Sequence, residues 1–572
     1  MTDKKTFIEG LITKMTLEQK VGQCLVIGFV GTMITPAILK RIRTCCPAGI
    51  RAGLTFRTKD AVHDPYAYNK EHADRAIRKP RGTVKDLATG VPVPWCTNEE
   101  YCHFLNILKQ EALKNGLGIP LHITLDMEGD ASADYFRGGI HYFPSPMGIA
   151  ATSDPGLAHD VAWATAAQLV PLGFDWIHSP VLDVNTNPLN PEIGSRSFGE
   201  TAKEVIRYGR EALRGFKTGG LITTGKHFPG RGASATDAHG HLPEIDLTRK
   251  DMETHLAPFQ ALIDAGLPCI MSAHTTYPAL DPSGTPASLS KPILTRLLKE
   301  DMGFQGAITT DDITMGGIVE KFEVAEACIL ALNAGNDLIL IRDESSLIDE
   351  VYPALLDAAR KKVIPEERLE DAVRRSLTVK YDYGLFERSG LWEDSKAGSG
   401  IADPKVIAIA ADAAQRTVVV LRDAAKILPL NRETKVLLVE QIHPLLRHTN
   451  TQSCHPGLLW EKLLEYSENV AMVETSLEYT RNEQQRVIDR IEEAEVIVIT
   501  NYYLRRYANG NDFVRRLSQF GKPVIVISNT PYPQSVLPEY KTVILNYGAS
   551  PESFAEVARH IFRGTTPPLP PR

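Results

Sequence analysis

Short apolar runs, each bounded by glycine, proline or aspartate, recur through the first two thirds of the chain and constrain its fold more than any other feature. Most are near-continuous rather than alternating, as expected for strands buried on both faces of a parallel sheet. Helical patterns lie between them, and several end at a glycine, which is a helix-stop signal. The eight runs cover residues 21–29, 48–56, 120–126, 174–180, 221–227, 268–274, 306–311 and 336–341.

Eight strands that alternate with helices predict an α/β fold, a (β/α)8 TIM barrel, with an open doubly wound sheet as the competing architecture. A second series of strand-like runs follows a polar stretch and predicts a smaller α/β sandwich domain. We therefore expect a TIM-barrel catalytic domain over residues 1–386, a linker over 387–403, a C-terminal α/β sandwich domain over 404–564 and a proline-rich tail over 565–572.

The composition narrows the classes of function. The net charge is −7 and no polybasic run is present, so a nucleic-acid partner is not expected. No apolar window reaches the roughly 18 residues of a membrane span, and the first twenty residues lack the apolar core of a signal peptide. Eight cysteines without a CxxC pair indicate reduced thiols. These features predict a cytoplasmic protein that binds neither nucleic acid nor membrane.

Polar side chains stand at the ends of five consecutive predicted barrel strands, where TIM-barrel enzymes place their active sites. One such residue is readily explained as a salt bridge, but five consecutive strand ends are not. Successive strand side chains point to opposite faces, so we select Asp311 rather than Asp312 as the carboxylate directed along the barrel axis. Asp312 fits a helix cap equally well. The strand-end residues are Asp126 with Glu128, Asp183 with Arg196, Lys226 with His227, His274, and Asp311.

Residues 226–243, KHFPGRGASATDAHGHLP, place many titratable groups beside three glycines that would let a loop bend and move. Asp237 and His239 are two residues apart, so the carboxylate can bond and orient the imidazole, as in a catalytic triad. This dyad is a candidate general acid/base. A zinc site that adds His227 and His241 competes, but no HxxxH or HExxH helix frames it. We predict no metal and no cofactor.

Taken together, these residues resemble glycoside hydrolase family 3, and within it the β-N-acetylglucosaminidases. Residues 226–243 are similar to that subgroup's KHFPG-[HR]-G…D-x-H signature. The segment VLDVNTNPLNPEIGSRSFG (181–199) resembles the family's loop after strand four, and TTDDITMGGI (309–318) resembles its nucleophile segment. The resemblance covers residues 1–385 and is looser beyond residue 400.

The resemblance implies a retaining exo-β-N-acetylglucosaminidase, a β-N-acetylhexosaminidase that acts on a β-linked GlcNAc-containing saccharide or glycoconjugate. Asp311 would form a covalent glycosyl-enzyme, and His239, oriented by Asp237, would serve as acid and then as base. An imidazole with a pKa near neutral suits both proton transfers around pH 7. The residues expected to bind substrate are Asp126, Arg196, Lys226 and His227, together with Asp183 and His274 at neighbouring strand ends.

Two departures from the family pattern concern the edge of the substrate. Where the family reads DxEGG-R, this chain reads DMEGDAS, with Asp130 in place of the second glycine and Arg137 as a candidate for the missing arginine. A long insertion, residues 57–119, follows the second strand. Segments of this length without periodicity are usually functional or disordered.

Other functions remain open at this stage. The same dyad would suit a β-N-acetylglucosaminide phosphorylase, because a neutral histidine does not repel phosphate. A family 3 glycosidase with another sugar preference, substrate-assisted catalysis through the acetamido group, and a non-catalytic carbohydrate-binding protein are further alternatives. The second domain would bind substrate, form a homodimer or only stabilise the fold.

Overall fold

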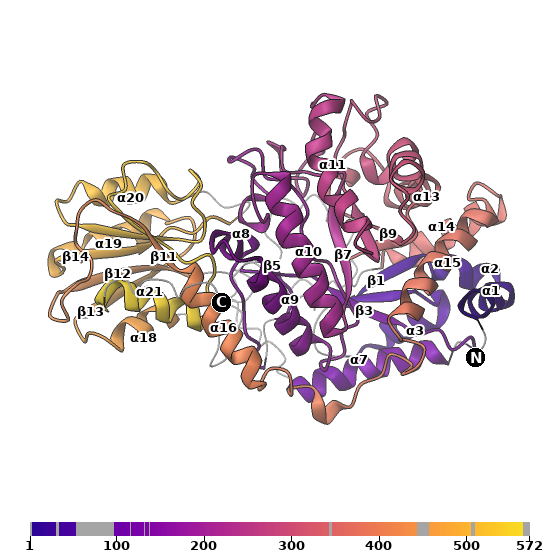
Figure 1. Ribbon diagram of the computed structural model, residues 1–572, viewed down its shortest axis with the longest axis horizontal. Helices are drawn as coiled ribbons and strands as arrows, with labels where there is room; N and C mark the ends of the chain where they lie inside the picture. Colours follow the sequence, from indigo (N-terminus) through magenta and orange to yellow (C-terminus); the bar gives the residue numbers. More distant parts are fainter. Residues whose placement is uncertain are drawn as a thin grey trace.

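The computed structural model describes residues 3–29, 34–52, 97–114, 116–130, 132–135, 138–342, 346–442, 457–504 and 509–563. Most of the predicted insertion, Arg137 and the predicted tail lie outside the described residues. A large α/β domain and a smaller one lie side by side, the smaller at the left in orange and yellow (Figure 1). Among the described residues, no helix combines the length and apolarity that crossing a membrane requires.

The eight predicted barrel strands form one parallel sheet in the order β10-β1-β2-β3-β6-β7-β8-β9. Three register pairs join β1 to β10, and a bridge from Thr309 to Leu338 joins β9 to the start of β10, so the sheet closes into a TIM barrel. All eight strands are buried, which explains their continuous apolar runs. Their bounds are β1 Leu25–Phe29, β2 Gly49–Ala52, β3 His122–Leu125, β6 Trp176–Ile177, β7 Ile222–Phe228, β8 Cys269–Ser272, β9 Ala307–Thr310 and β10 Ile339–Ile341.

Helices surround the barrel and begin mostly at side-chain caps. Thr201, for example, accepts the backbone N–H of Glu204 at the start of α10, and Gly220 ends that helix at φ 89°. A hairpin of β4 (Met127–Gly129) and β5 (Ser132–Ala133) follows β3. The helices are α1 Lys4–Lys14, α2 Leu17–Gly22, α3 Pro36–Cys45, α7 Asn98–Leu113, α8 Pro146–Ala151, α9 Pro155–Leu169, α10 Ala202–Gly219, α11 Arg249–Ile263, a π-helix Pro292–Asp301, α12 Gly316–Val319, α13 Val324–Ala334, α14 Ile348–Arg360 and α15 Glu366–Asp382.

The second domain contains a six-stranded sheet in the order β11-β16-β15-β14-β12-β13, parallel except for β11, which runs antiparallel to β16. Its strands are β11 Val419–Asp423, β12 Val436–Gln441, β13 Val470–Thr475, β14 Val496–Thr500, β15 Val524–Ser528 and β16 Thr542–Leu545. Its helices are α16 Pro404–Thr417, α18 Leu458–Leu464, α19 Arg481–Ile488, α20 Asn511–Ser518 and α21 Pro551–Arg563. All six strands overlap runs of the second series, which were predicted over residues 417–422, 435–440, 469–474, 495–500, 523–528 and 541–547.

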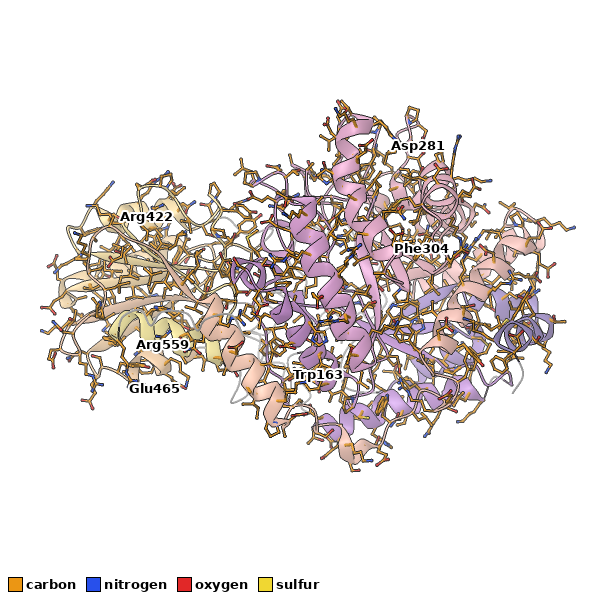
Figure 2. The ribbon with its side chains drawn as sticks, viewed as in Figure 1. Trp163, Asp281, Phe304, Arg422, Glu465 and Arg559 are labelled. Carbon is orange, nitrogen blue, oxygen red and sulfur yellow. The ribbon has the colours of Figure 1, made fainter. Side chains whose placement is uncertain are left out.

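Helix α16 connects the two domains by packing along α9 of the barrel. The Lys405 ammonium lies 3.6 Å from the centroid of the Trp163 ring, which Figure 2 labels on α9. Arg416 pairs with Asp154 at 2.9 Å, just before α9 begins. A cation–π contact and an ion pair therefore fix the helix that leads into the second domain.

The second domain also contacts the segment that follows β6, residues 181–199, here named the β6 loop. The Tyr503 hydroxyl donates to the carbonyl of Pro191 at 2.8 Å. Two further hydrogen bonds join the same loop to the second domain. The Gln534 amide donates to the Pro188 carbonyl of the loop at 3.0 Å, and the Asn185 amide of the loop donates to the Tyr532 hydroxyl at 2.9 Å. The smaller domain thus supports a loop that carries predicted site residues.

Asp130, the departure from the family's glycine, lies at this domain boundary. Its φ of 46° is in the left-handed region, where the family glycine would be favoured and aspartate is one of the better tolerated alternatives. Its buried carboxylate accepts a hydrogen bond from the Asn529 amide of the second domain at 3.1 Å. The aspartate therefore adds a contact between the domains that glycine could not make.

Candidate active site

A network of charged side chains joins the ends of β2, β3 and β7. Asp126 accepts from Lys226 at 2.8 Å through Oδ1 and from Arg51 at 2.6 Å through Oδ2. Glu128 binds Arg196 at 2.7 and 3.0 Å and also contacts Lys226. Burial would raise the pKa of Glu128, but the charges of Arg196 and Lys226 lower it to about 2. The result is a fixed array of charged donors and acceptors suited to a polar ligand.

His227 lies behind this network with a defined tautomer. Its Nδ1 is 2.7 Å from Asp183, so Nδ1–H donates to the carboxylate and Nε2 is directed towards Asp311, 3.9 Å away. Burial, followed by the charges of Arg231 and Arg196, lowers the pKa of His227 well below its usual value. The imidazole is therefore neutral, and its Nε2 accepts from Arg196 Nη2 at 3.5 Å.

Asp183 and His274, both predicted to bind substrate, are fully buried and bonded to protein groups. Besides His227, Asp183 accepts the backbone N–H of Arg231 at 2.6 Å. His274 donates from Nε2 to the carbonyl of Asp312 at 3.0 Å and accepts at Nδ1 from the Ser288 hydroxyl at 2.7 Å. These contacts place both residues in support of their neighbours, and direct contact of either with substrate stays a prediction.

Asp311 and Asp312 have the different environments that strand alternation predicts. Asp311 is 15% exposed at the end of β9, and Arg231 Nη1 lies 3.5 Å from its Oδ2. Burial would raise the pKa of Asp311, but the charges of Arg231, His274 and His239 lower it to about 2. Asp312 is buried and accepts from the backbone and hydroxyl of Thr314. Asp311 is thus the ionised carboxylate that faces the site.

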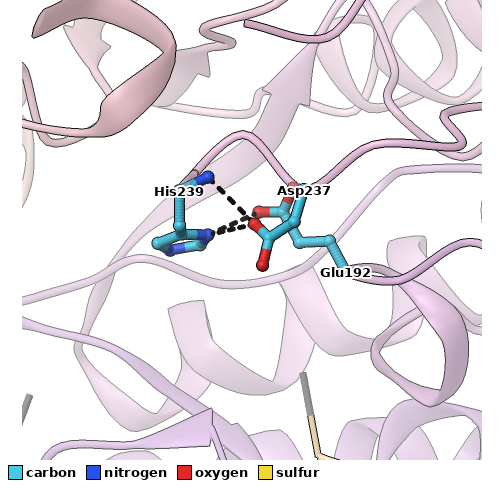
Figure 3. A group of neighbouring side chains, drawn as sticks. All are labelled: Glu192, Asp237 and His239. Carbon is cyan, nitrogen blue, oxygen red and sulfur yellow. Dashed lines mark hydrogen bonds and ion pairs between the residues drawn. The ribbon is translucent and has the colours of Figure 1, made fainter. Parts of the chain in front are cut away.

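Asp237 and His239 form the predicted pair on residues 237–241, here named the dyad loop (Figure 3). Asp237 Oδ1 accepts from the ring Nδ1 of His239 at 2.7 Å and from its backbone N–H at 2.9 Å. The imidazole proton therefore sits on Nδ1, which makes Nε2 the ring nitrogen that would transfer a proton. Backbone bonds from Gly316 and Gly317, which follow Asp311, reach this loop, so it lies beside the segment that carries the carboxylate.

The dyad loop is docked on the segment that follows Asp311. The backbone N–H groups of Gly316 and Gly317 donate to the carbonyls of His239 and Ala238 at 3.3 and 2.9 Å. A Cβ atom on Gly316 would lie 2.6 Å from the carbonyl oxygen of Gly240. Gly316 is therefore required for close approach of the two segments.

The glycines that precede the dyad loop have packing roles, which differs from the predicted role in bending. Gly230 has φ 118° and lies against His255, where a Cβ would be 2.8 Å from the His255 Cβ. Gly232 lies against the β6 loop, and a Cβ there would be 1.7 Å from the carbonyl oxygen of Val184. Composition alone does not distinguish a flexible glycine from one that lacks space for a side chain.

Three charged residues of the site have no role in the sequence-based predictions. Arg51 lies within β2 and holds Asp126. Arg231 stands beside Asp311, and Glu192 of the β6 loop pairs with Arg231 at 2.5 Å. Arg51 could have been identified from the sequence, because a charged residue inside a buried apolar run needs a buried partner. Glu192 and Arg231 are 39 positions apart on irregular segments, where no periodicity relates them.

Among the described residues, Glu192, Asp237 and His239 form a group whose potential metal-binding atoms lie within 4.8 Å of one another. This set differs from the predicted zinc alternative, which relied on His227 and His241. The Arg231 guanidinium already pairs with Glu192, so a positive charge occupies one side of the group. The lack of metal dependence stays a prediction.

A TIM barrel with an ionised carboxylate at one strand end and a carboxylate–histidine pair docked beside it has the groups that hydrolysis of a glycoside requires. Residues 89–379 match the family model described as "Glycosyl hydrolase family 3 N terminal domain". The chain belongs to glycoside hydrolase family 3.

Known relatives agree with this membership. A beta-hexosaminidase A of Pseudoalteromonas piscicida is 34% identical over 296 residues, which are 48% of this chain and 50% of that protein. A beta-hexosaminidase of Alkalilimnicola ehrlichii is 33% identical over 245 residues, 42% of this chain and 69% of its own. A solved family 3 beta-N-acetylglucosaminidase from Paenibacillus sp. str. FPU-7 superposes with a TM-score of 0.80 at 25% identity, over 96% of this chain and 97% of that chain.

Proposed function

We propose that this chain is a retaining exo-β-N-acetylglucosaminidase in which Asp311 is the nucleophile and the Asp237–His239 pair is the acid/base. One observation carries the proposal: the ionised Asp311 and the oriented His239 lie on two segments that dock directly against each other. The names of the relatives support an N-acetylhexosaminide as the substrate.

In the first step, an oxygen of Asp311 attacks the anomeric carbon, and the bond to the leaving oxygen breaks. The proton on Nε2 of protonated His239 passes to that oxygen, so a neutral alcohol departs. Asp237 stabilises the imidazolium through Nδ1–H. The low pKa of Asp311 keeps it ionised, as a nucleophile requires.

In the second step, neutral His239 accepts a proton from water through Nε2, and the water oxygen attacks the anomeric carbon. The bond to Asp311 breaks, which releases the sugar with its original configuration and restores both residues. The hydroxyl groups of the sugar would meet Asp126, Lys226 and Arg196. Asp126 is the most accessible acceptor of that network, with 26% of its side chain exposed.

A comparison of wild type with Asp311→Ala and His239→Ala tests the proposal across β-GlcNAc glycosides of decreasing leaving-group pKa. We expect Asp311→Ala to abolish turnover of all of them. His239→Ala should lose on the order of 10²–10⁴-fold with chitobiose and far less with a dinitrophenyl glycoside, whose departure needs no acid. Equal losses by His239→Ala on every substrate would contradict the acid role.

Two further measurements separate the alternatives. A 5-fluoro-GlcNAc donor should label Asp311, and an unlabelled Asp311 would contradict the covalent mechanism in favour of the acetamido group as nucleophile. Product analysis in the presence of phosphate should give free GlcNAc. Formation of GlcNAc 1-phosphate alone would mean that phosphate, not water, is the acceptor.

A further inference from the structure

Glu192 connects the two halves of the candidate active site. It lies in the β6 loop, and its Oε1 is 2.5 Å from Arg231 Nη2 and 3.4 Å from His239 Nδ1. Its Oε2 accepts the backbone N–H of Ala238 at 3.3 Å. One carboxylate therefore contacts the guanidinium beside Asp311, the imidazole of His239 and the backbone of the dyad loop.

Burial gives Glu192 a single orientation. Its side chain is 1% exposed, and a buried carboxylate is stable only when it is paired and hydrogen-bonded. Arg231, itself 1% exposed, supplies the charge, and the β6 loop fixes the backbone through Asn190, which accepts the N–H of Glu192 at 2.9 Å. The acceptor that Glu192 presents to Ala238 is therefore preorganised.

The dyad loop needs such an anchor because it has no regular secondary structure. Asp237 orients the His239 ring, but Asp237 belongs to the same loop and would move with it. Glu192 belongs to a different loop. Its bond to Ala238 and its proximity to His239 therefore fix the position of the Asp237–His239 pair relative to the barrel. The carbonyl of Ala238 accepts from the backbone N–H of Gly317, so this residue is held through both of its backbone groups.

We propose that Glu192 is a positioning residue that holds the dyad loop closed and thereby places His239 for proton transfer. The inference rests on the function proposed above. Glu192 does not contact the reacting atoms; it acts through Ala238 and His239 on one side and through Arg231 and Arg196 on the other, with Arg196 Nη1 at 3.7 Å from Oε1. A loosened loop moves the imidazole relative to the leaving oxygen, and a displacement of about 1 Å costs on the order of 10²-fold in rate.

The test compares Glu192→Gln and Glu192→Asp with wild type, each alone and combined with His239→Ala. Gln removes the charge, whereas Asp keeps it beside Arg231 but withdraws the acceptor from the dyad loop. We expect both single variants to lose on the order of 10²-fold in kcat/KM with chitobiose and less than about threefold with a dinitrophenyl glycoside. In the His239→Ala background, neither should cause a further loss on chitobiose.

Glu200→Gln is the matched control, because Glu200 follows the β6 loop and contacts Tyr532 instead of the dyad loop. It should leave the dependence on leaving group unchanged. Equal losses on all substrates by both Glu192 variants, or losses that multiply with that of His239→Ala, would overturn the proposal. If His239→Ala itself shows no dependence on the leaving group, the proposed function fails rather than the role of Glu192.

Discussion

Arg231 should control the pH at which Asp311 becomes a nucleophile. Its Nη1 lies 3.5 Å from Asp311 Oδ2. At an effective dielectric constant of about 20, two unit charges at that separation attract by about 5 kcal/mol. One pKa unit corresponds to about 1.36 kcal/mol. Loss of one third of this attraction would therefore raise the pKa of Asp311 by at least one unit.

The direction of the shift follows from the charge. Arg231 lowers the pKa of Asp311, so Arg231→Met should raise it and protonate the carboxylate at a higher pH. The acid limb of kcat/KM should therefore move towards neutral pH by one unit or more, while the alkaline limb stays. The assay is kcat/KM for a dinitrophenyl β-GlcNAc glycoside from about pH 1.5 to pH 8, so that the wild-type limb near the Asp311 pKa of about 2 falls inside the range. This substrate reduces the contribution of His239.

Arg231→Lys is the control, since it keeps a positive charge in the site. Removal of one partner from a buried pair costs about 3–5 kcal/mol of stability, so thermal unfolding must show that Arg231→Met is folded at the assay temperature. An acid limb that stays at its wild-type position in a folded Arg231→Met variant would refute the electrostatic reasoning, even if overall activity falls.

Three other predictions concern loop support and metal dependence. Tyr503→Phe removes the bond to the Pro191 carbonyl and should lower the free energy of unfolding by about 1 kcal/mol in urea titration; an unchanged midpoint would contradict a stabilising contact. Gly316→Ala places a Cβ 2.6 Å from the Gly240 carbonyl oxygen and should reduce activity most with poor leaving groups, whereas Gly10→Ala, with no atom within 4 Å, should have no effect. Dialysis against EDTA should leave kcat/KM unchanged, and recovery of a lost activity by Zn²⁺ would instead support a metal at Glu192, Asp237 and His239.

The barrel could be predicted because each of its strands is buried on both faces and therefore reads as an apolar run. The different environments of Asp311 and Asp312 agree with the alternation expected at a strand end, and the role of Asp311 as the nucleophile stays a prediction. The predicted strand ends located Asp183 and His274 but did not predict the residues to which they hydrogen-bond. Which strand-end residue meets substrate and which supports a neighbour depends on contacts across several strands.

Glu192 and Arg231 could not be related to each other from sequence. Each lies on an irregular segment, and their contact depends on how the two loops fold over the end of the barrel. The docking of the dyad loop on Gly316 and Gly317 is likewise a contact between segments far apart in the sequence. Long-range contacts between loops leave no periodic pattern in the sequence, so these parts of the site are seen only in the folded structure.

The boundary between the domains does not coincide with a boundary of function. The β6 loop carries Glu192 and Arg196, yet it takes hydrogen bonds from Tyr503 and Gln534 of the second domain. A truncated chain that ends after α15 would retain every proposed catalytic side chain and lose these bonds. Removal of the second domain would thus take two hydrogen-bond donors from the loop that carries Glu192, and a shortened enzyme would need replacement contacts at Pro188 and Pro191.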